Sequence, residues 1–513
     1  PQGGRSMTRS PRTARREGRG VDRLLADFGH QVPSVAVAEP EPKPERLFHP
    51  VPRRGERRPD RGWSPAPAPL LQYRMSADQA GVLWPLVTNP SLPARGAQMG
   101  IDYFSGASFH ADPNGWVLDE AIPVSNPNMI TFGKPGMGKS GTVKAFLLRM
   151  FGFGYRALIL GDVKDEYVPL CHAVGVTPIA IGQGLPARIN PLEFGPLAAG
   201  WEQLDAKEAK KRAAVVFARW LTLIRGLVGS QKVGQSPVPF GPTEEVAVDA
   251  ALRSLTGYDD GNTRLAETTI PRLWQLLNNP PDDLVETCRY ASRRHFLDET
   301  RLLRDALGQL TSGTLQGLFD DHTNIGIDWN APIQSLSLSR LSVLGDEAVG
   351  MALMCLNSWG RAMRDVAAPA DMRIVVRDES WKQMRLGVEA VKSFDADLRL
   401  SRTAGDIPFS LCHKPSDLLS VGDAHSQAVA IAKDLLHLHD IKIVHGLDVK
   451  LAEELRSLLG LPDVAVNLVT DWCRQAPGRA LWIVGEAMFK VQTILHPAER
   501  ALTWTNTSLE KAA

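Results

Sequence analysis

The stretch that most constrains the fold of this chain spans residues 128–146 and reads NMITFGKPGMGKSGTVKAF. An apolar pair, Met129 and Ile130, leads into a glycine-rich turn that ends in Lys139 and Ser140, and a helical pattern follows. Glycines in such a turn let backbone N–H groups point at phosphate oxygens, and the N-terminus of the next helix adds partial positive charge. The spacing Gly-x4-Gly-Lys-Ser therefore predicts a phosphate-binding loop between a strand and a helix.

Each part of this loop has a predicted task. Lys139 is expected to reach the β- and γ-phosphates of a nucleotide as a catalytic residue, and the Ser140 hydroxyl is expected to bind Mg²⁺. The alternative is a glycine-rich surface turn, which the flanking strand and helix disfavour. The expected nucleotide-binding residues are Gly133, Lys134, Pro135, Gly136, Met137, Gly138, Lys139, Ser140 and Gly141.

A phosphate-binding loop needs a second carboxylate at the end of a neighbouring strand, and the stretch RIVVRDESW supplies one. Asp378 is predicted to hold Mg²⁺ through water, and Glu379 is predicted to act as the catalytic base. The adjacent Asp-Glu pair favours a hydrolysing motor ATPase, and the chain has no NKxD motif for guanine. We therefore expect ATP and Mg²⁺ as ligands. Arg377 is an unusual charge directly before this pair, and an ordinary acidic surface pair is the alternative reading.

Two other apolar strands end in polar residues. The stretch GDVKDEY places Asp162, Lys164 and Glu166 after one strand, and His413 ends the strand in IPFSLCH. Ligands of open α/β sheets bind at the carboxyl ends of the strands, so these side chains are candidates for the same site. A solvated charged turn and a histidine with a structural hydrogen bond are the respective alternatives.

The order of the predicted elements indicates an α/β protein. Strand patterns occur at 155–162, 333–339, 373–379, 407–413 and 441–446, and a C-terminal hairpin is predicted to turn at Gly485 and Glu486. Helical patterns dominate between the strands at 155–162 and 333–339. The predicted divisions are a disordered basic tail at 1–70, an irregular or β-rich segment at 71–125, a sheet domain at 126–200 and 331–513, and a helical insertion at 201–330.

Composition adds limits to this scheme. Residues 1–61 hold 14 Lys and Arg against 8 Asp and Glu, a net charge of +6, so the remainder carries −5 of the total of +1. Charge alone therefore does not favour nucleic-acid binding by the globular part. The tail has one apolar helical stripe, Val21, Leu24, Leu25 and Phe28, which is either a chance cluster or a docking helix. Five distant cysteines without a CxxC pair fit a reducing cytosol, and no apolar run reaches the roughly 18 residues of a membrane span.

Taken in order, six motifs resemble one family. The stretches GKPGMGKSGTVKAF, LGDVKDEY, RINPLEF, LFDDHTN, VVRDESW and LCHKPSDL are similar to those of the TraC-like ATPases of conjugative type IV secretion systems. These ATPases belong to the HerA/FtsK group of hexameric motors. The resemblance covers roughly residues 95 to 505, and it implies a RecA-like P-loop NTPase sheet.

The resemblance also implies roles for particular residues. Asp378 and Glu379 match the metal-binding and catalytic pair, with Trp381 as the aromatic residue that commonly follows it. His413 stands where the family usually has a glutamine that senses the γ-phosphate. Arg402 lies near a basic position before this strand and becomes the first candidate for an arginine acting on the next subunit, with Arg399 as the second. The stretch DVKDEY matches the DPKGEY-like turn of the family, and Asn190-Pro191 matches its NPL turn.

The resemblance makes a functional expectation concrete. We expect a cytoplasmic, membrane-peripheral homo-hexamer that energises a conjugative or type IV secretion apparatus and docks on its membrane components. A DNA translocase of the FtsK/HerA or coupling-protein type is the first alternative. In that case the protein must bind DNA directly. An ATP-binding scaffold with little hydrolysis is the second alternative, because Arg377 and His413 depart from the usual residues. Members of the family often have a large N-terminal docking domain, and we expect the tail and the segment at 71–125 to stand in its place, as in a split version of the family protein.

Overall fold

The computed structural model describes residues 92–198, 200–234, 236–258, 265–313, 315–326, 328, 330–364, 372–414, 416 and 427–503. The described residues all belong to one compact unit, Asn89–Ala513. The tail at 1–70 with its apolar stripe Val21, Leu24, Leu25 and Phe28 lies outside them, as does the first part of the segment at 71–125.

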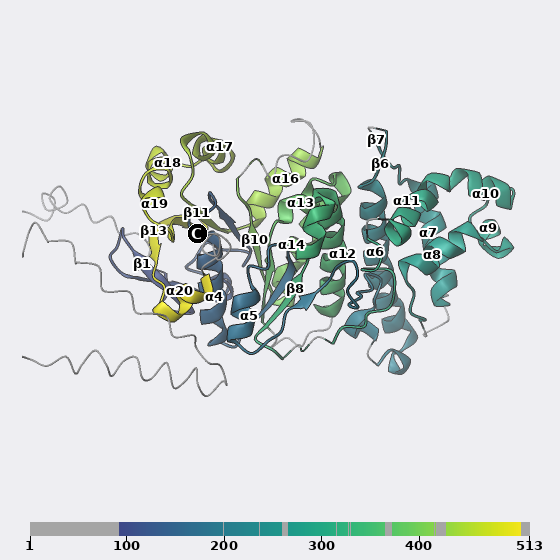
Figure 1. The fold of residues 1–513 in the computed structure, drawn as a ribbon, viewed down its shortest axis with the longest axis horizontal. Coiled ribbons are helices and arrows are strands. Elements are labelled where there is room, and N and C mark those ends of the chain that lie inside the picture. The colour runs from purple at the N-terminus through teal and green to yellow at the C-terminus, as the bar shows by residue number, and fades with distance from the viewer. Residues whose placement is uncertain are drawn as a thin grey trace, which may run out of the picture. The chain divides into compact units, whose positions relative to one another are not determined.

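A single large sheet forms the centre of this unit (Figure 1). Its described strands follow the order β2-β1-β13-β12-β11-β3-β10-β9-β4-β8-β5. The run from β11 to β5 is parallel, whereas β12, β13, β1 and β2 are joined antiparallel. The strands are β1 Ala97–Asp102, β2 Ser108–Ala111, β3 Met129–Phe132, β4 Arg156–Asp162, β5 Ile179–Ala180, β8 Ile333–Ser337, β9 Arg373–Arg377, β10 Ile407–Leu411, β11 Ile441–His445, β12 Arg479–Val484 and β13 Ala487–Thr493.

The described helices cover both faces of the sheet and extend beyond one end of it. Figure 1 shows α7 to α11 gathered at one end of the unit, whereas α17 to α20 lie at the other. A short hairpin of β6 Lys232–Val233 and β7 Ser236–Pro237 follows α6. The helices are α3 Pro113–Leu118, α4 Lys139–Phe151, α5 Val168–Ala173, α6 Ala206–Gly229, α7 Pro242–Thr256, α8 Ile270–Asn278, α9 Asp282–Thr287, α10 Arg293–Glu299, α11 Arg301–Ser312, α12 Asp346–Arg364, α13 Ser380–Met384, α14 Val388–Ala404, α16 Gln427–Leu438, α17 Val449–Leu459, α18 Asp463–Thr470, α19 Trp472–Gln475 and α20 Pro497–Thr503.

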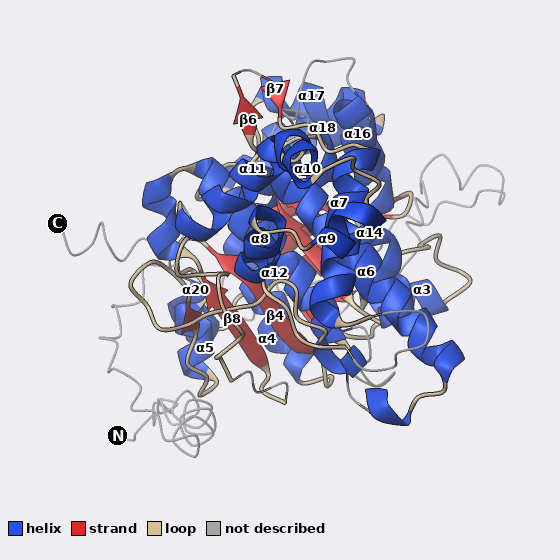
Figure 2. Ribbon diagram, turned by 90° about the vertical axis from the view of Figure 1, so that its right-hand side faces the viewer, coloured by secondary structure: helices blue, strands red, loops and turns tan. Residues whose placement is uncertain are grey.

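The central strands are buried on both faces, which explains their continuous apolar runs. Every residue of β3, β8, β9 and β10 is buried. On one face, Ile159 and Val376 pack in a cluster with Phe146 of α4. On the other face, Leu160 and Val375 join a cluster that includes α6 and α12, and Figure 2 shows strands β4 and β8 running behind these helices.

Strand order determines which loops meet. Strand β10 lies between β3 and β9, and β4 lies on the other side of β9. Because these four strands are parallel, their carboxyl ends meet at one edge of the sheet. The glycine-rich loop after β3, His413 after β10, the Asp-Glu pair after β9 and Lys164 after β4 therefore stand in this spatial order.

The structure confirms the predicted α/β class and each predicted strand of the parallel part. It also confirms the C-terminal hairpin, since Val484 pairs with Ala487 across the turn at Gly485 and Glu486. Strands β1 and β2 come from the segment at 71–125, and β1 extends the same sheet by pairing with β13. The division into domains by residue ranges stays a prediction. None of the described helices has the length and low charge needed to cross a lipid bilayer.

Candidate active site

The glycine-rich loop has a backbone path that only glycine accommodates well. Gly136 and Gly138 have φ angles of 81° and 93°, in the left-handed region, and Gly138 caps the N-terminus of α4. A Cβ atom on Gly138 would lie 2.4 Å from the backbone nitrogen of Gly478. The Gly478 N–H also donates to the Met137 carbonyl at 3.0 Å. The loop is therefore held in shape by its own glycines and by close contact with the chain before β12.

Lys139 is buried beneath this loop. Its side chain is 7% exposed, and its ammonium group donates to the carbonyl of Gly133 and, at 3.3 Å, to that of Lys134. Burial lowers the pKa of Lys139 to about 8, although the nearby Asp378 opposes this shift. A positive charge in a desolvated position interacts strongly with an anion, so a phosphate group would suit this position.

The acidic side of the site lies across β10. Asp378 is 8% exposed, and burial followed by the charges of Glu166 and Glu379 raises its pKa to about 7. The Oε2 atom of Glu166 is buried and has no hydrogen-bond partner among the described residues. This excess of carboxylate fits a divalent cation, and Asp378 together with Ser140 would hold Mg²⁺ there.

Glu379 is buried, and both of its carboxylate oxygens have partners. Oε1 accepts from the Lys164 ammonium and lies 3.3 Å from Nε2 of His413, while Oε2 accepts from the Trp381 indole at 2.6 Å. Burial would raise the pKa of Glu379, but the hydrogen bonds from His413 and Lys164 outweigh it and lower the pKa to about 2. Glu379 also has a φ of 53°, a left-handed conformation that is uncommon for a residue with a side chain.

One cavity of about 890 Å³ joins these groups. A volume of this order suits a nucleotide-sized ligand. Glu379, Gly133 and Met137 are not among the described residues that line it, although Gly133 and Met137 make contacts within the loop. The lining residues are Lys134, Pro135, Gly136, Gly138, Lys139, Ser140, Gly141, Thr142, Lys164, Glu166, Asp378, Leu411, Cys412, His413, Pro477, Gly478, Gln492, Thr493, Ile494, Leu495, Arg500 and Thr503.

Of the two candidate arginines, Arg399 is not among the described residues that line this cavity. Arg402 lies in α14, and the structure does not describe its side chain. Arg399, on the same helix, is 56% exposed and forms a 2.8 Å ion pair with Asp395. Arg377 is buried beneath the sheet edge, where its guanidinium stacks 5.2 Å from the Phe394 ring and donates to Asn357 at 3.2 Å. The proposed action of Arg402 or Arg399 on a neighbouring subunit stays a prediction.

The C-terminal part of the cavity was missed by sequence reasoning. Residues after β13 and in α20 line it, including Gln492, Arg500 and Thr503. The hairpin itself was predicted, but its place beside the glycine-rich loop depends on the pairing of β12 with β11, which has no local signal. The turn at Asn190 is structural in this chain. Its side-chain amide donates to the Thr268 carbonyl at 2.8 Å and ties the start of the helical region to a later loop.

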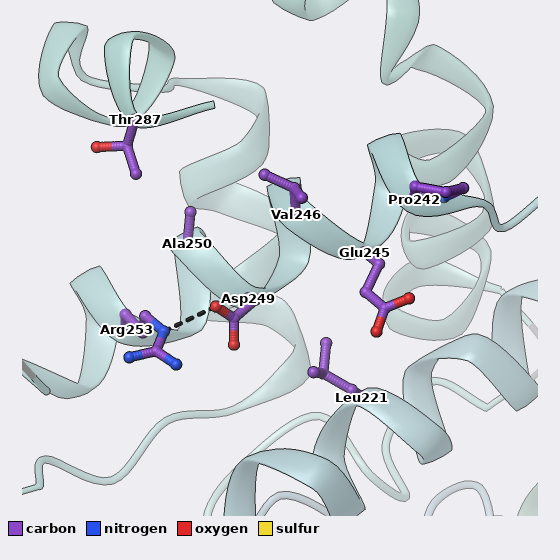
Figure 3. A pocket seen from close by; sticks show the side chains of 8 residues that line it. All are labelled: Leu221, Pro242, Glu245, Val246, Asp249, Ala250, Arg253 and Thr287. Atoms are coloured by element: carbon purple, nitrogen blue, oxygen red, sulfur yellow. Dashed lines mark hydrogen bonds and ion pairs between the residues drawn. The ribbon is translucent and has the colours of Figure 1, made fainter. Parts of the chain in front are cut away.

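A second cavity of about 560 Å³ lies on the helical region, along α7 (Figure 3). Its charged side chains are paired: Arg253 donates to Asp249 at 2.7 Å, and Glu245 pairs with Arg225. Val246 supplies an apolar surface beside them and is 49% exposed. The described side chains of this cavity do not include a buried lysine and a buried carboxylate like those that line the first cavity.

Known structures share this fold. VirB4 of Thermoanaerobacter pseudethanolicus is 19% identical with a TM-score of 0.60, over 80% of this chain and 99% of that chain. The bacterial conjugative coupling protein TrwBdeltaN70 in its unbound monoclinic form is 13% identical with a TM-score of 0.50, over 79% of this chain and 90% of that chain. Plasmid coupling protein TrwB in complex with the non-hydrolysable ATP analogue ADPNP is 13% identical with a TM-score of 0.51. The match covers 79% of this chain and 91% of that chain.

Sequence comparisons add no relative. No protein-family model matches the chain, and no curated protein matches it. At identities of 13% to 19%, the likeness to VirB4 and TrwB is a likeness of fold. The chain has the fold expected from its motifs, a RecA-like P-loop NTPase sheet with added helices.

Proposed function

We propose that this protein is a Mg²⁺-dependent ATPase that acts as a motor of a conjugative or type IV secretion apparatus. The observation that carries the ATPase assignment is the meeting of Lys139, Asp378 and the Lys164–Glu379–His413 cluster at the ends of four adjacent parallel strands. The lysine proposed to bind phosphate and the carboxylate proposed to bind metal both line the same cavity.

The residues divide the chemistry between them. The glycine-rich loop and Lys139 would bind the β- and γ-phosphates, and Ser140 with Asp378 would hold the Mg²⁺ that arrives with the nucleotide. Bound Mg²⁺ would neutralise phosphate charge that develops during hydrolysis. Glu379 would accept a proton from the attacking water, and His413 would donate a hydrogen bond toward the γ-phosphate.

The secretion role rests on two supports of different kinds. Six motifs in order resemble those of the TraC-like conjugative ATPases, and the fold is similar to that of VirB4 and of the conjugative coupling protein TrwB. We infer a homo-hexamer at the cytoplasmic face of the membrane that docks on membrane components of the secretion apparatus. Affinity purification of the tagged protein from its own membranes tests this, because membrane-embedded secretion components should co-purify. Recovery of the protein without any such component would count against the role.

A DNA-translocating function is the second candidate, because TrwB is a coupling protein and shares the fold. The two candidates differ in their response to DNA. A translocase should hydrolyse ATP faster in the presence of DNA, and the stimulation should fall steeply with salt concentration. The net charge of −5 outside the first 61 residues favours an ATPase whose rate is independent of DNA.

Ring formation is part of the proposal. An arginine from the next subunit contributes on the order of 10³ to 10⁵ in rate to some phosphoryl-transfer enzymes. The specific activity should therefore rise with protein concentration until rings form. Arg402→Ala should flatten that rise, with Arg399→Ala as the second variant to compare. A constant specific activity in a protein that stays monomeric would exclude this part of the proposal.

A further inference from the structure

Lys164 lies on a loop after β4 whose backbone is held in a defined conformation. It follows β4, where the strand breaks register between Leu160 and Asp162 and Gly161 has a φ of 85°. The Asp162 carboxylate then accepts backbone N–H bonds from Glu166 at 3.0 Å and Tyr167 at 2.9 Å. The bulge and these bonds fix the backbone of the loop that carries Lys164, while its long side chain stays 47% exposed.

Lys164 lies between the cavity and Glu379. Lys164 and His413, which both contact Oε1 of Glu379, line the cavity, whereas Glu379 is not among the described residues that line it. The other oxygen of Glu379 accepts from Trp381. A carboxylate with both oxygens engaged in this way is poorly placed to receive a proton from water. Oε1, the oxygen contacted by the two cavity-lining residues, has both lone pairs occupied, so Lys164 or His413 must leave before it can accept a proton from water in the cavity.

Lys164 is the donor best placed to leave. Trp381 is two residues from Glu379, in α13, and is not among the described residues that line the cavity, whereas Lys164 has a long flexible stem and lines it. Glu166 and Asp378 lie near the same ammonium and would hold it close to the cavity. A triphosphate bound by Lys139 would bring a new anion within the space that this ammonium faces.

We propose that Lys164 is a positioning residue that moves from Glu379 to the γ-phosphate of a bound nucleoside triphosphate and so frees Glu379 to accept a proton from water. This inference rests on the ATPase function proposed above. A diphosphate lacks the group that draws Lys164 away, so Glu379 stays engaged when ADP is bound. Whether Glu379 can accept a proton thus depends on which nucleotide is bound. A triphosphate whose γ-phosphate is out of place would not draw Lys164 away and would be hydrolysed slowly.

Nucleotide affinities test the exchange directly. The dissociation constants of Mg-ADP and of a non-hydrolysable Mg-ATP analogue are measured for the parent, Lys164→Met, Glu379→Gln and the double variant. Lys164→Met should weaken binding of the ATP analogue about tenfold, because a charge-assisted contact to the γ-phosphate is lost. The affinity for ADP should stay within about twofold of the parental value. Glu379→Gln should tighten the analogue about fivefold without changing ADP, since Lys164 no longer leaves a charged partner.

The double variant carries the decisive comparison. The gain in affinity for the ATP analogue caused by Glu379→Gln should disappear when Lys164 is replaced by Met. The reason is that the same lysine contacts Glu379 in one state and the γ-phosphate in the other. Lys134→Met is the matched control, since Lys134 also lines the cavity but pairs with Asp448. It should leave the gain from Glu379→Gln intact. Lys164→Arg should keep most of the preference for the triphosphate, which a purely structural role would not require.

Three results separate the possible failures. If the parent binds neither nucleotide, the proposed ATPase function is wrong. If the parent binds both and Lys164→Met weakens both alike or neither, only the exchange of partners is wrong. If the gain from Glu379→Gln persists in the double variant, Lys164 is likewise excluded as its source. Lys164→Gln serves for the same measurements if Lys164→Met does not fold.

Discussion

The two sides of the cavity are built by different means. On the side proposed to bind phosphate, a continuous stretch of backbone with left-handed glycines surrounds one buried lysine, Lys139. On the hydrolytic side, isolated side chains at the ends of three strands meet: Lys164 after β4, Glu379 after β9 and His413 after β10. The first side depends on local backbone geometry, and the second depends on strand order.

This difference has a functional meaning. The glycine-rich loop already has the conformation that suits phosphate oxygens, because contacts to Gly478 and Lys139 hold it. The carboxylate of Glu379, in contrast, is occupied by donors from its own chain. Binding of nucleotide and its hydrolysis should therefore respond separately to substitution, and variants on the two sides test that separation.

The largest effect is expected from Lys139→Ala on the phosphate-binding side. This variant removes the buried positive charge from the loop, so ATP affinity or turnover should fall at least about 100-fold. Equilibrium binding of a fluorescent ATP analogue and a phosphate-release assay measure the two quantities. Lys211→Ala is the control, because its exposed ammonium pairs with Glu208 on α6 and Lys211 is not among the described residues that line the cavity. Normal ATPase activity in Lys139→Ala would contradict the assignment of the loop.

A second effect on the same side comes from Gly138→Ala. The new methyl group would lie 2.4 Å from the Gly478 nitrogen at a φ of 93°, so the loop and the chain before β12 must separate. We expect ATP affinity to fall roughly tenfold and the free energy of unfolding to drop by about 2 kcal/mol. Gly136→Ala is the matched control, since its φ is 81° but nothing lies within 4 Å of the added atom. Its free energy of unfolding should drop by only about 1 kcal/mol. Equal effects in both variants would show that contact with Gly478 is unimportant.

On the hydrolytic side, His413→Ala should separate turnover from binding. Loss of the donor proposed for the γ-phosphate should lower ATP turnover about tenfold, while ADP affinity stays within about twofold because ADP has no γ-phosphate. His413→Gln supplies a comparable donor and should keep much of the activity. Steady-state phosphate release and ADP titrations check both. If the Ala variant matches the parent in every measurement, His413 has a structural role at the end of β10.

The smallest effect is a pH dependence of stability beneath the phosphate-binding loop. His445 is fully buried beside Gly133, and burial together with the charge of Lys139 lowers its pKa to about 3. The unfolded chain binds a proton near pH 6.5 and the folded chain does not, so stability present above pH 6.5 is lost as the pH falls toward 3. At pH 5 this histidine should account for about 2 kcal/mol of lost stability. Urea unfolding at pH 7 and pH 5 should show a smaller loss in His445→Leu, and equal losses would mean that His445 is protonated in the folded protein.

The contrast between the two sides also explains how far the sequence could be interpreted. The loop from Gly133 to Ser140 is one contiguous motif, so its path and its lysine follow from local residue types. The apolar runs predicted the parallel strands because strands buried on both faces leave that pattern. Asp378 and Glu379 became candidates because they directly follow such a run.

The missing parts are non-local. The sequence placed Lys164 at a strand end but could not pair it with Glu379, because that contact requires β4 to lie beside β9. It likewise gave no sign that Arg500 and Thr503 line the cavity, since α20 reaches the site only through the antiparallel addition of β12 and β13. These contacts join residues more than 200 positions apart, and no local pattern encodes them.

The most direct test of the account is the fate of ATP on the purified protein and on its Glu379→Gln variant in the presence of Mg²⁺. The parent should release phosphate with repeated turnover. The variant should bind ATP at least as tightly but hydrolyse it at less than about 1% of the parental rate, because the amide keeps the shape and loses the base. Chromatography of the bound nucleotide should then recover intact ATP from the variant and ADP from the parent. A parent without Mg²⁺-dependent turnover, or a variant that turns over like the parent, would contradict the central claim.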